Sequence, residues 1–375
     1  MSSIFSSHYS SILISQNMAF SFGFTTEALS DDELNEYQEV EQSNTREKRS
    51  ALEAFSENIP VDYLPKLQPL GEILKSLEGV RLSYDRYDTP AGHNSIFKRD
   101  LFDVKHQVMC EEERTRSVSS DVLLQESRES DLKKNYYEGG FKIWECSYDM
   151  IDRLEDFYES GKLSQYSTYL ELGCGTALPT CFLLKKKLES NSKVPTKFIL
   201  SDFNYEVLRL VTLPNLILQW MSSIPREKLI TLSSSEDGPS LESGEVLLSK
   251  RVLQEFQRTL EFNCISLTFV SGSWGTQFNK LVENFGVDFI VTSETIYSME
   301  SLPVVAESIV HILDQSNSEH SCCLVASKNI YFGVGGSVMD FISYIKERIS
   351  PGYELSVEEV PSSQVKRSII KLERV

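Results

Sequence analysis

The chain has 375 residues, of which 41 % are hydrophobic and 10 % aromatic, so it can form a substantial buried core. Its formal net charge of −18 disfavours a nucleic-acid substrate, because a phosphate backbone would be repelled, and it favours a basic protein partner. Seven scattered cysteines, no C-x-x-C pair and only five histidines disfavour a zinc site or a disulfide framework and indicate a reducing compartment.

The N-terminal part of the chain is expected to be largely disordered and to carry no targeting signal. The sequence has no run of about 18 apolar residues, so no membrane-spanning helix is expected. The first 17 residues lack the Lys and Arg of signal and transit peptides. Residues 30–48 are dense in Asp, Glu, Gln, Ser and Asn, with too few apolar groups to offset the entropy of ordering. We therefore expect residues 1–68 to be an acidic, largely disordered region.

Residues 69–135 are expected to form an extension made of one helix and a β-hairpin. Leucine and isoleucine residues between positions 70 and 77 are spaced as on one face of a helix, and Gly79 is suited to end it. Residues 80–87 alternate in hydrophobicity as a strand does, and residues 96–109 are interpreted as its partner strand.

From residue 136 onward the sequence alternates between apolar strands and amphipathic helices, and it ends in two strands joined by a short turn. This alternation predicts an α/β fold with a parallel, doubly wound sheet, to which the final hairpin adds one antiparallel strand. Residues 136–375 are thus predicted to be one seven-strand, Rossmann-like domain with a polar insertion at 222–245. The predicted strands are 167–172, 197–201, 265–270, 287–292, 321–327, 353–360 and 367–374, and the predicted helices are 149–158, 178–188, 206–221 with a break at Pro214, 246–260, 278–282, 302–313 and 337–349.

The first strand of this sheet runs into a glycine-rich turn, Glu171-x-Gly173-x-Gly175. Glycine allows the backbone to turn sharply and to approach a ligand closely, and Thr176 is suited to cap the following helix. The start of a helix presents free N–H groups to a ligand. A dinucleotide fold requires a third glycine where this chain has Leu178, which disfavours a dehydrogenase.

Polar and aromatic residues follow the other parallel strands, at the edge of the sheet where ligands bind in such folds. Asp202 follows the second strand at a distance suited to a ribose diol, and Trp274 follows the third, where it can cover an adenine ring. Ser293, Glu294 and Tyr297 follow the fourth strand. Each residue alone also fits a helix cap, a core side chain or a solvated loop acid, but their recurrence at successive strand ends predicts a single site.

Several stretches of the sequence together resemble the eukaryotic protein-histidine N-methyltransferases, and in particular the fungal members. The resemblance rests on residues 135–147, 170–179, 201–204, 271–274 and 293–297, with further similarity at 99–106 and 18–24. Because the family start aligns with Met18, residues 1–17 are expected to be an addition. The resemblance implies a seven-strand methyltransferase domain that uses S-adenosylmethionine, with cofactor contacts at Ile143, Trp144, Glu145, Cys146, Ser147, Gly173, Gly175, Asp202, Phe203, Asn204, Ser273, Trp274 and Ser293.

The resemblance also implies a substrate. Family members resembling this chain methylate a histidine of a large-subunit ribosomal protein at the tele nitrogen, the ring nitrogen far from the backbone. A related branch methylates lysine and carries D-x-x-Y where this chain has Glu294-x-x-Tyr297, a difference that favours histidine. We hypothesise that Glu294 accepts the other ring N–H and so orients the imidazole, that Tyr297 shapes the pocket, and that Glu145 is the second candidate for the acceptor.

Two other functions stay open on the sequence alone. One is a protein-lysine methyltransferase of the neighbouring branch, which the number of transferred methyl groups would distinguish. The other is a non-catalytic binder of a basic ribosomal protein, which a lack of cofactor binding would favour. In every case we expect a monomer that binds neither nucleic acid nor membrane and is located in the cytoplasm, with access to the nucleus implied by the resemblance.

Overall fold

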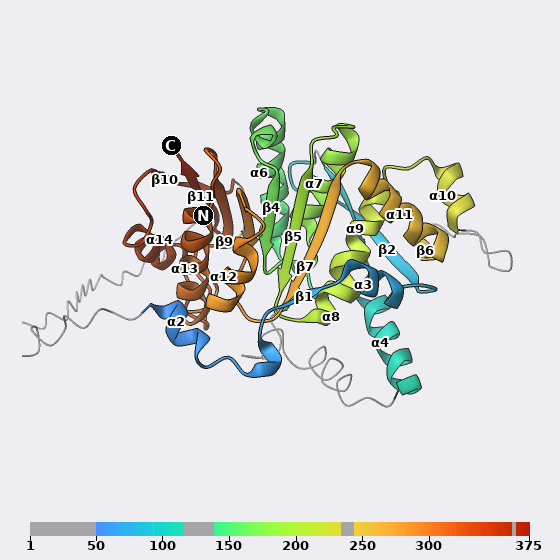
Figure 1. Ribbon diagram of the computed structural model, residues 1–375, viewed down its shortest axis with the longest axis horizontal. Helices are drawn as coiled ribbons and strands as arrows, with labels where there is room; N and C mark the ends of the chain where they lie inside the picture. The colour runs from blue at the N-terminus through green and yellow to red at the C-terminus, as the bar shows by residue number, and fades with distance from the viewer. Residues whose placement is uncertain (1–49, 93, 116–138, 234–243, 362–364) are drawn as a thin grey trace, which may run out of the picture. The chain divides into compact units, whose positions relative to one another are not determined.

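Eight strands form one central sheet, in the order β1-β7-β5-β4-β8-β9-β11-β10 (Figure 1). The computed structural model describes residues 50–92, 94–115, 139–233, 244–361 and 365–375. The five middle strands from β7 to β9 run parallel, whereas β11 runs antiparallel to both of its neighbours. The predicted doubly wound sheet with a closing hairpin is therefore confirmed. The bounds are β1 Lys66–Gln68, β4 Thr168–Leu172, β5 Thr196–Asp202, β7 Ile265–Ser271, β8 Phe289–Ser293, β9 Cys322–Lys328, β10 Tyr353–Glu359 and β11 Arg367–Arg374.

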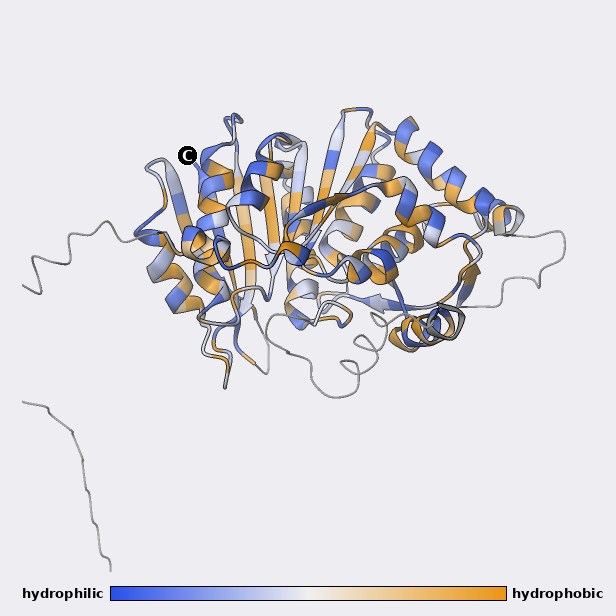
Figure 2. Ribbon diagram, turned by 60° about the horizontal axis from the view of Figure 1, so that its bottom comes forward, coloured by the Kyte–Doolittle hydropathy of each residue, from blue (hydrophilic) through white to orange (hydrophobic). Residues whose placement is uncertain are grey.

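Helices cover both faces of this sheet because successive strand residues point to opposite sides. Tyr169 of β4 belongs to one apolar core and its neighbour Leu170 to the other. In Figure 2 the central strands are largely orange, whereas the helices carry both orange and blue residues. The first core holds α3 Leu70–Ser76, α6 Glu145–Glu159, α7 Leu178–Glu189, α9 Leu213–Met221 and α11 Lys250–Phe262, and the second holds α12 Thr276–Glu283, α13 Ser301–Asp314 and α14 Val338–Lys346.

The segment before β1 is ordered from Ser50, so the predicted disorder of residues 50–68 is wrong. Residues 1–49 lie outside the part of the chain that the structure describes. Helix α2 (Ala51–Ser56) begins at Ser50, whose side chain accepts a hydrogen bond from the Glu53 N–H. Its first N–H groups donate to Glu307 of α13, at 3.2 Å from Ala51 and 2.9 Å from Leu52. A short 3₁₀ helix, η1 (Val61–Tyr63), then leads into β1.

The predicted hairpin is confirmed only in its first half. Strand β2 (Arg81–Asp88) pairs with β3 (Ser95–Arg99) and, on its other side, with β6 (Glu245–Leu247). The chain then forms helix α4 (Leu101–Thr115), so the prediction of one strand over 96–109 is wrong.

A turn at Asp100 explains why the second strand stops there. The Asp100 side chain accepts a hydrogen bond from the Phe102 N–H at 2.8 Å. Val104 and Val108 lie one helical turn apart and pack together against Leu210 and other apolar residues. The apolar residues after position 100 therefore have the spacing of a helix.

The predicted break at Pro214 takes the form of one π-helical turn, η3 (Leu208–Thr212), between α8 (Tyr205–Val207) and α9. Proline has no N–H to donate to the carbonyl four residues earlier, which here is that of Leu210. The Leu210 carbonyl instead accepts a hydrogen bond from Nη1 of the buried Arg99 side chain, at 2.9 Å. Arg99 thus satisfies the backbone group that Pro214 leaves free.

The region after α9 also differs from the prediction. The insertion at 222–245 contains α10 (Arg226–Ser233), and residues 234–243 lie outside the described part. Val246 and its neighbours form β6 and not the start of a helix, because Val246 pairs with Leu82 of β2. Helix α11 begins only after Ser249, whose side chain accepts from the Val252 N–H at 3.3 Å. Among the described residues, no helix is long and apolar enough to cross a membrane.

Candidate active site

The glycine-rich turn after β4 contains two backbone conformations that favour glycine. Gly173 and Gly175 have φ angles of 63° and 49°, in the left-handed region. A Cβ atom on Gly173 would lie 2.7 Å from Cγ2 of Thr295 and 3.3 Å from the ring of Trp274. Gly173 is therefore needed because the loops after β7 and β8 pack directly against it.

The start of α7 is capped from within the core, and the prediction that Thr176 caps it is wrong. Ala177, at φ 53°, is the N-cap residue and makes no side-chain cap. Glu171 accepts hydrogen bonds from the Thr180 N–H, at 3.1 Å, and from the Thr180 hydroxyl. Burial raises the pKa of the Glu171 carboxyl to about 8, although these hydrogen bonds oppose the shift. The helix start thus offers fewer free N–H groups than the sequence predicts.

Asp202 ends β5 directly beside the glycine-rich turn. Its carboxylate accepts hydrogen bonds from the N–H groups of Gly175, at 3.0 Å, and Asn204, at 3.1 Å. Burial raises the pKa of Asp202 to about 6, so the group is mostly ionised at neutral pH. Gly140 packs close by, since a Cβ on it would lie 3.3 Å from Asp202 Oδ2. The Asn204 side chain is itself engaged in capping α8, where it accepts from the Glu206 N–H.

The N-terminal segment packs against Ser273 and Phe203, two of the predicted cofactor contacts, and the sequence did not reveal this packing. The Tyr63 carbonyl accepts a hydrogen bond from the Ser273 N–H at 2.8 Å, and the Tyr63 ring stacks on Phe203 at 5.1 Å. The indole N–H of Trp274 donates to Ser201 Oγ at 3.3 Å. The capping pattern Ser50-x-x-Glu53 was the sequence signal that order begins before Pro69.

The Trp144 segment leads into α6 and carries five of the predicted cofactor contacts. The Trp144 indole N–H donates to the Gly139 carbonyl at 3.2 Å. This hydrogen bond holds Gly139 and Gly140 against the Trp144 ring. Ile143 packs against the first apolar core, and the Ser147 N–H donates to the Trp144 carbonyl. Cys146 is buried, and burial raises the pKa of its thiol, so it is not a reactive thiolate.

Glu294 is the most constrained residue of the site. It is buried and holds a left-handed backbone with φ 56°, a conformation that is costly for a side chain of this size. Its N–H donates to the Ala326 carbonyl at 2.8 Å. Its carboxylate accepts from the Cys146 N–H and the Tyr331 hydroxyl, each at 3.3 Å, and lies 3.1 Å from Lys328 Nζ. These contacts fix the carboxylate at the strand edge.

Lys328 is the site residue that sequence reasoning missed. Its ammonium group lies 3.0 Å from Glu145 and 3.1 Å from Glu294, and 5.2 Å from the centre of the Trp144 ring. Burial alone would lower the pKa of Lys328, but the two carboxylates raise it, so the group stays protonated. Lys328 is the last residue of β9, as Asp202 is the last residue of β5. Examining the residues at the end of β9, as was done for the other parallel strands, would have identified Lys328.

Two further predicted residues, Ser293 and Tyr297, follow β8. Ser293 has a buried hydroxyl for which no hydrogen-bond partner exists within the described residues. The Tyr297 ring contacts that of Tyr331 edge to face at 6.4 Å. The Ser293 hydroxyl, the Asp202 carboxylate and the Trp274 ring follow strands at the same edge of the sheet, a set that suits a ligand with hydroxyl groups and an aromatic ring. The donor set therefore fits the cofactor that the resemblance implies.

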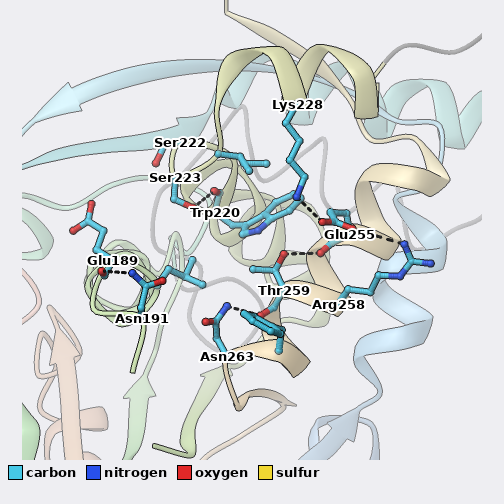
Figure 3. A pocket seen from close by; sticks show the side chains of 13 residues that line it. Glu189, Asn191, Trp220, Ser222, Ser223, Lys228, Glu255, Arg258, Thr259 and Asn263 are labelled. Atoms are coloured by element: carbon cyan, nitrogen blue, oxygen red, sulfur yellow. Dashed lines mark hydrogen bonds and ion pairs between the residues drawn. The ribbon is translucent and has the colours of Figure 1, made fainter. Parts of the chain in front are cut away.

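A separate hollow of about 760 Å³ lies among α7, α9, α10 and α11 (Figure 3). Asn191 and Asn263 line it near the starts of β5 and β7, at the edge of the sheet opposite to the predicted site. Its charged groups are paired, since Glu255 lies 2.8 Å from Lys228 and 3.7 Å from Arg258. None of the predicted site residues lines this hollow.

The order of the seven predicted strands, the terminal hairpin and the acidic and glycine residues at the strand ends define a Rossmann-like methyltransferase of the seven-strand class, to which β1 adds an eighth strand that the sequence did not predict. No family model matches the chain. It is 38 % identical over 377 residues to "Histidine protein methyltransferase 1" of Saccharomyces cerevisiae, covering 95 % of this chain and 98 % of that relative. The chain belongs to this histidine protein methyltransferase family.

A second fungal relative and a solved structure extend the comparison. "Histidine protein methyltransferase 1" of Schizosaccharomyces pombe is 33 % identical over 329 residues, covering 85 % of this chain and 89 % of the relative. A magnesium protoporphyrin IX methyltransferase from Synechocystis is 9 % identical with a TM-score of 0.35, over 71 % of this chain and 99 % of that one. That likeness is too low to add to the assignment, which rests on the fungal relatives.

Proposed function

We propose that this protein transfers a methyl group from S-adenosylmethionine to the tele nitrogen of a histidine in a large-subunit ribosomal protein. Family membership supports the reaction, and the fixed, buried Glu294 carboxylate at the strand edge is the observation that carries it. The acidic chain, at −18, suits a basic substrate. We further propose that the enzyme acts as a monomer in the cytoplasm with access to the nucleus.

The cofactor would be held by residues of the glycine-rich turn and the neighbouring strand ends. We assign the ribose to the Asp202 carboxylate, the adenine side to Trp274 and Ser273, and a further polar contact to the Ser293 hydroxyl. The remaining contacts assigned are those of the Trp144 segment and of Phe203 and Asn204. When bound, S-adenosylmethionine supplies a methyl group on a positively charged sulfur.

Glu294 would select the nitrogen that reacts. The Glu294 carboxylate is contacted by the backbone N–H and the thiol of Cys146, by the Tyr331 hydroxyl and by Lys328. The N–H of a neutral imidazole would take the place of one of these donors, which leaves the lone pair of the other ring nitrogen free to attack. Because neutral imidazole already has that lone pair, alignment and tautomer choice are the main tasks of the site.

Lys328 would position Glu294 without contacting the substrate nitrogen. Two carboxylates, Glu145 and Glu294, face one ammonium group, so the cluster keeps an excess of negative charge. That excess stabilises the positive charge that develops on the imidazole as it gains a methyl group.

The decisive experiment is transfer of labelled methyl groups into purified ribosomal proteins, with the modified residue and ring nitrogen mapped by mass spectrometry. Glu294→Gln removes the charge but keeps the size of the side chain, and we expect about a tenfold or greater loss of kcat with mixed ring-nitrogen products. Glu354→Gln, on the exposed face of β10, is the matched control and should leave the rate unchanged. Wild-type rate and product from Glu294→Gln would remove Glu294 from the mechanism, and a methylated lysine would establish the alternative activity.

A further inference from the structure

Two loops next to Glu294 form one continuous rim at the edge of the site. Residues 294–300 follow β8 and residues 329–337 follow β9. The Gly336 N–H donates to the Tyr297 carbonyl at 3.0 Å, and a backbone bridge joins Ser298 to Gly335. Gly336 has no room for a side chain, because a Cβ on it would overlap the Ile296 carbonyl oxygen. The second loop is therefore fixed against the first.

Three large apolar side chains of this rim point into solvent. Phe332 is 85 % exposed, Met299 is 59 % exposed and Ile330 is 54 % exposed. We call these three residues the apolar rim. Met299 contacts the second loop directly, since a Cβ on Gly335 would lie 3.4 Å from Met299 Cγ. Single exposed apolar residues are common, whereas three of them on two joined loops next to the candidate site are suited to contact a partner.

The apolar rim is continuous with the site through adjacent residues. Tyr331 turns inward, where its hydroxyl donates to Glu294, and the next residue, Phe332, turns outward. Neighbouring Cα atoms are only about 3.8 Å apart, so Phe332 lies within reach of a substrate segment that places a side chain at Glu294.

The charge of the second loop indicates what kind of side chain it receives. No residue from 329 to 337 is charged, although the whole chain carries a net charge of −18. The second loop thus favours an apolar side chain, whereas the exposed Glu300, next to Met299 on the first loop, offers a counter-charge to a basic one. Basic groups of the substrate would instead be attracted by the acidic remainder of the protein.

We propose that the apolar rim binds an apolar side chain of the substrate protein within a few residues of the target histidine. The occupant is the histidine-bearing segment itself, so the inference rests on the proposed function and adds a sequence requirement to it. Phe332 acts as the central contact, because an exposed aromatic ring offers the largest area at low entropic cost.

The test uses the full-length enzyme, a ribosomal protein fraction, and short synthetic peptides with one histidine flanked by serine and glycine. Single leucines placed at each neighbouring position should raise kcat/KM about tenfold at one or two positions. Phe332→Ser should abolish that preference, lower kcat/KM on ribosomal protein about tenfold through KM, and leave S-adenosylmethionine affinity by calorimetry unchanged. Phe262→Ser, another exposed aromatic at the opposite edge of the sheet, is the matched control and should change neither value.

The outcomes separate the two proposals. An active wild type that shows no leucine preference, or a Phe332→Ser enzyme as efficient as the wild type, would overturn the apolar rim and leave the proposed function standing. A wild type that binds the cofactor but transfers no methyl group to any histidine would overturn both.

Discussion

Single residues of the site combine unfavourable conformations with several compensating contacts. Glu294 adopts a left-handed backbone that costs about 1–3 kcal/mol, and it is held by its backbone bond to Ala326 and by contacts of its carboxylate. Glu171 and Asp202 are buried carboxylates with raised pKa values beside the same glycine-rich turn. Such strain and burial are typical of residues retained for function.

Glu171 should make stability depend on pH in a defined direction. Its pKa rises from 4.5 to about 8 on folding, so the folded state binds the proton more tightly than the unfolded state. The contribution of Glu171 is therefore fully present below the unfolded pKa and is lost as pH rises towards about 8. Between about pH 5 and 8, Glu171→Gln should gain up to about 1.4 kcal/mol per pH unit relative to the wild type.

Urea unfolding of both proteins across this pH range measures the difference. Because glutamine does not titrate, any fixed cost of the amide is the same at every pH and does not affect the slope. Parallel curves for the two proteins would show that Glu171 keeps an ordinary pKa.

Among the elements, the π-helical turn η3 is held from two sides. On one side, Arg99 of β3 donates to the Leu210 carbonyl. On the other, the Thr212 hydroxyl donates to the Gly175 carbonyl at 2.6 Å, and the Asn215 side chain donates to the Thr176 carbonyl at 2.8 Å. Arg99 thus supports the glycine-rich turn indirectly, through Leu210 and Asn215.

Removing Arg99 should therefore destabilise the fold and also weaken cofactor binding. Arg99→Met would leave the Leu210 carbonyl and the side chains of Asp103 and Gln107 without their donor, at a cost of roughly 3 kcal/mol in unfolding free energy. Arg86→Met, at an exposed pair with Asp88, is the control and should cost less than about 1 kcal/mol. Chemical unfolding and calorimetric titration with S-adenosylmethionine measure the two effects, and equal costs for the two variants would contradict this role.

The strands and the glycine-rich turn could be predicted because their signals are local. Apolar runs bounded by glycines, and the rule that ligands lie at the carboxyl ends of parallel strands, were enough to bring Gly173, Asp202 and Trp274 together. The pairing of Glu294 with Lys328 could not be predicted, because it joins residues 34 positions apart by sequence number through the register of β8 and β9. No local pattern reports which side chains a parallel register places side by side.

The prediction that the ordered part begins at residue 69 was wrong for a similar reason. The polar composition of residues 30–48 was extended to residues 50–68, which are richer in apolar residues and make long-range contacts to α13 and β7. Composition measures whether a segment can form its own core, and it does not register a segment that completes the core of another. The strand predicted over 96–109 failed because its alternation covered only the first few residues.

At the scale of the whole molecule, net charge should control how fast substrate arrives. A chain at −18 attracts a basic ribosomal protein over distances that salt screens. We expect kcat/KM on such a substrate to fall severalfold between about 0.05 and 0.5 M salt, while kcat stays constant. A short neutral peptide is the control, and an equal decline with that peptide would mean that salt acts on the enzyme itself.

The short strand β1 has one more consequence. Lys66, Leu67 and Gln68 pair with Ser271, Val270 and Phe269, so they occupy the outer edge of β7. An unpaired edge strand is a template for sheet extension by another molecule. A chain that begins at residue 69, the start of order predicted from the sequence, would expose the edge of β7. We expect this shortened chain to self-associate, which light scattering would measure. Three residues that contribute little to the core thus protect the sheet against aggregation.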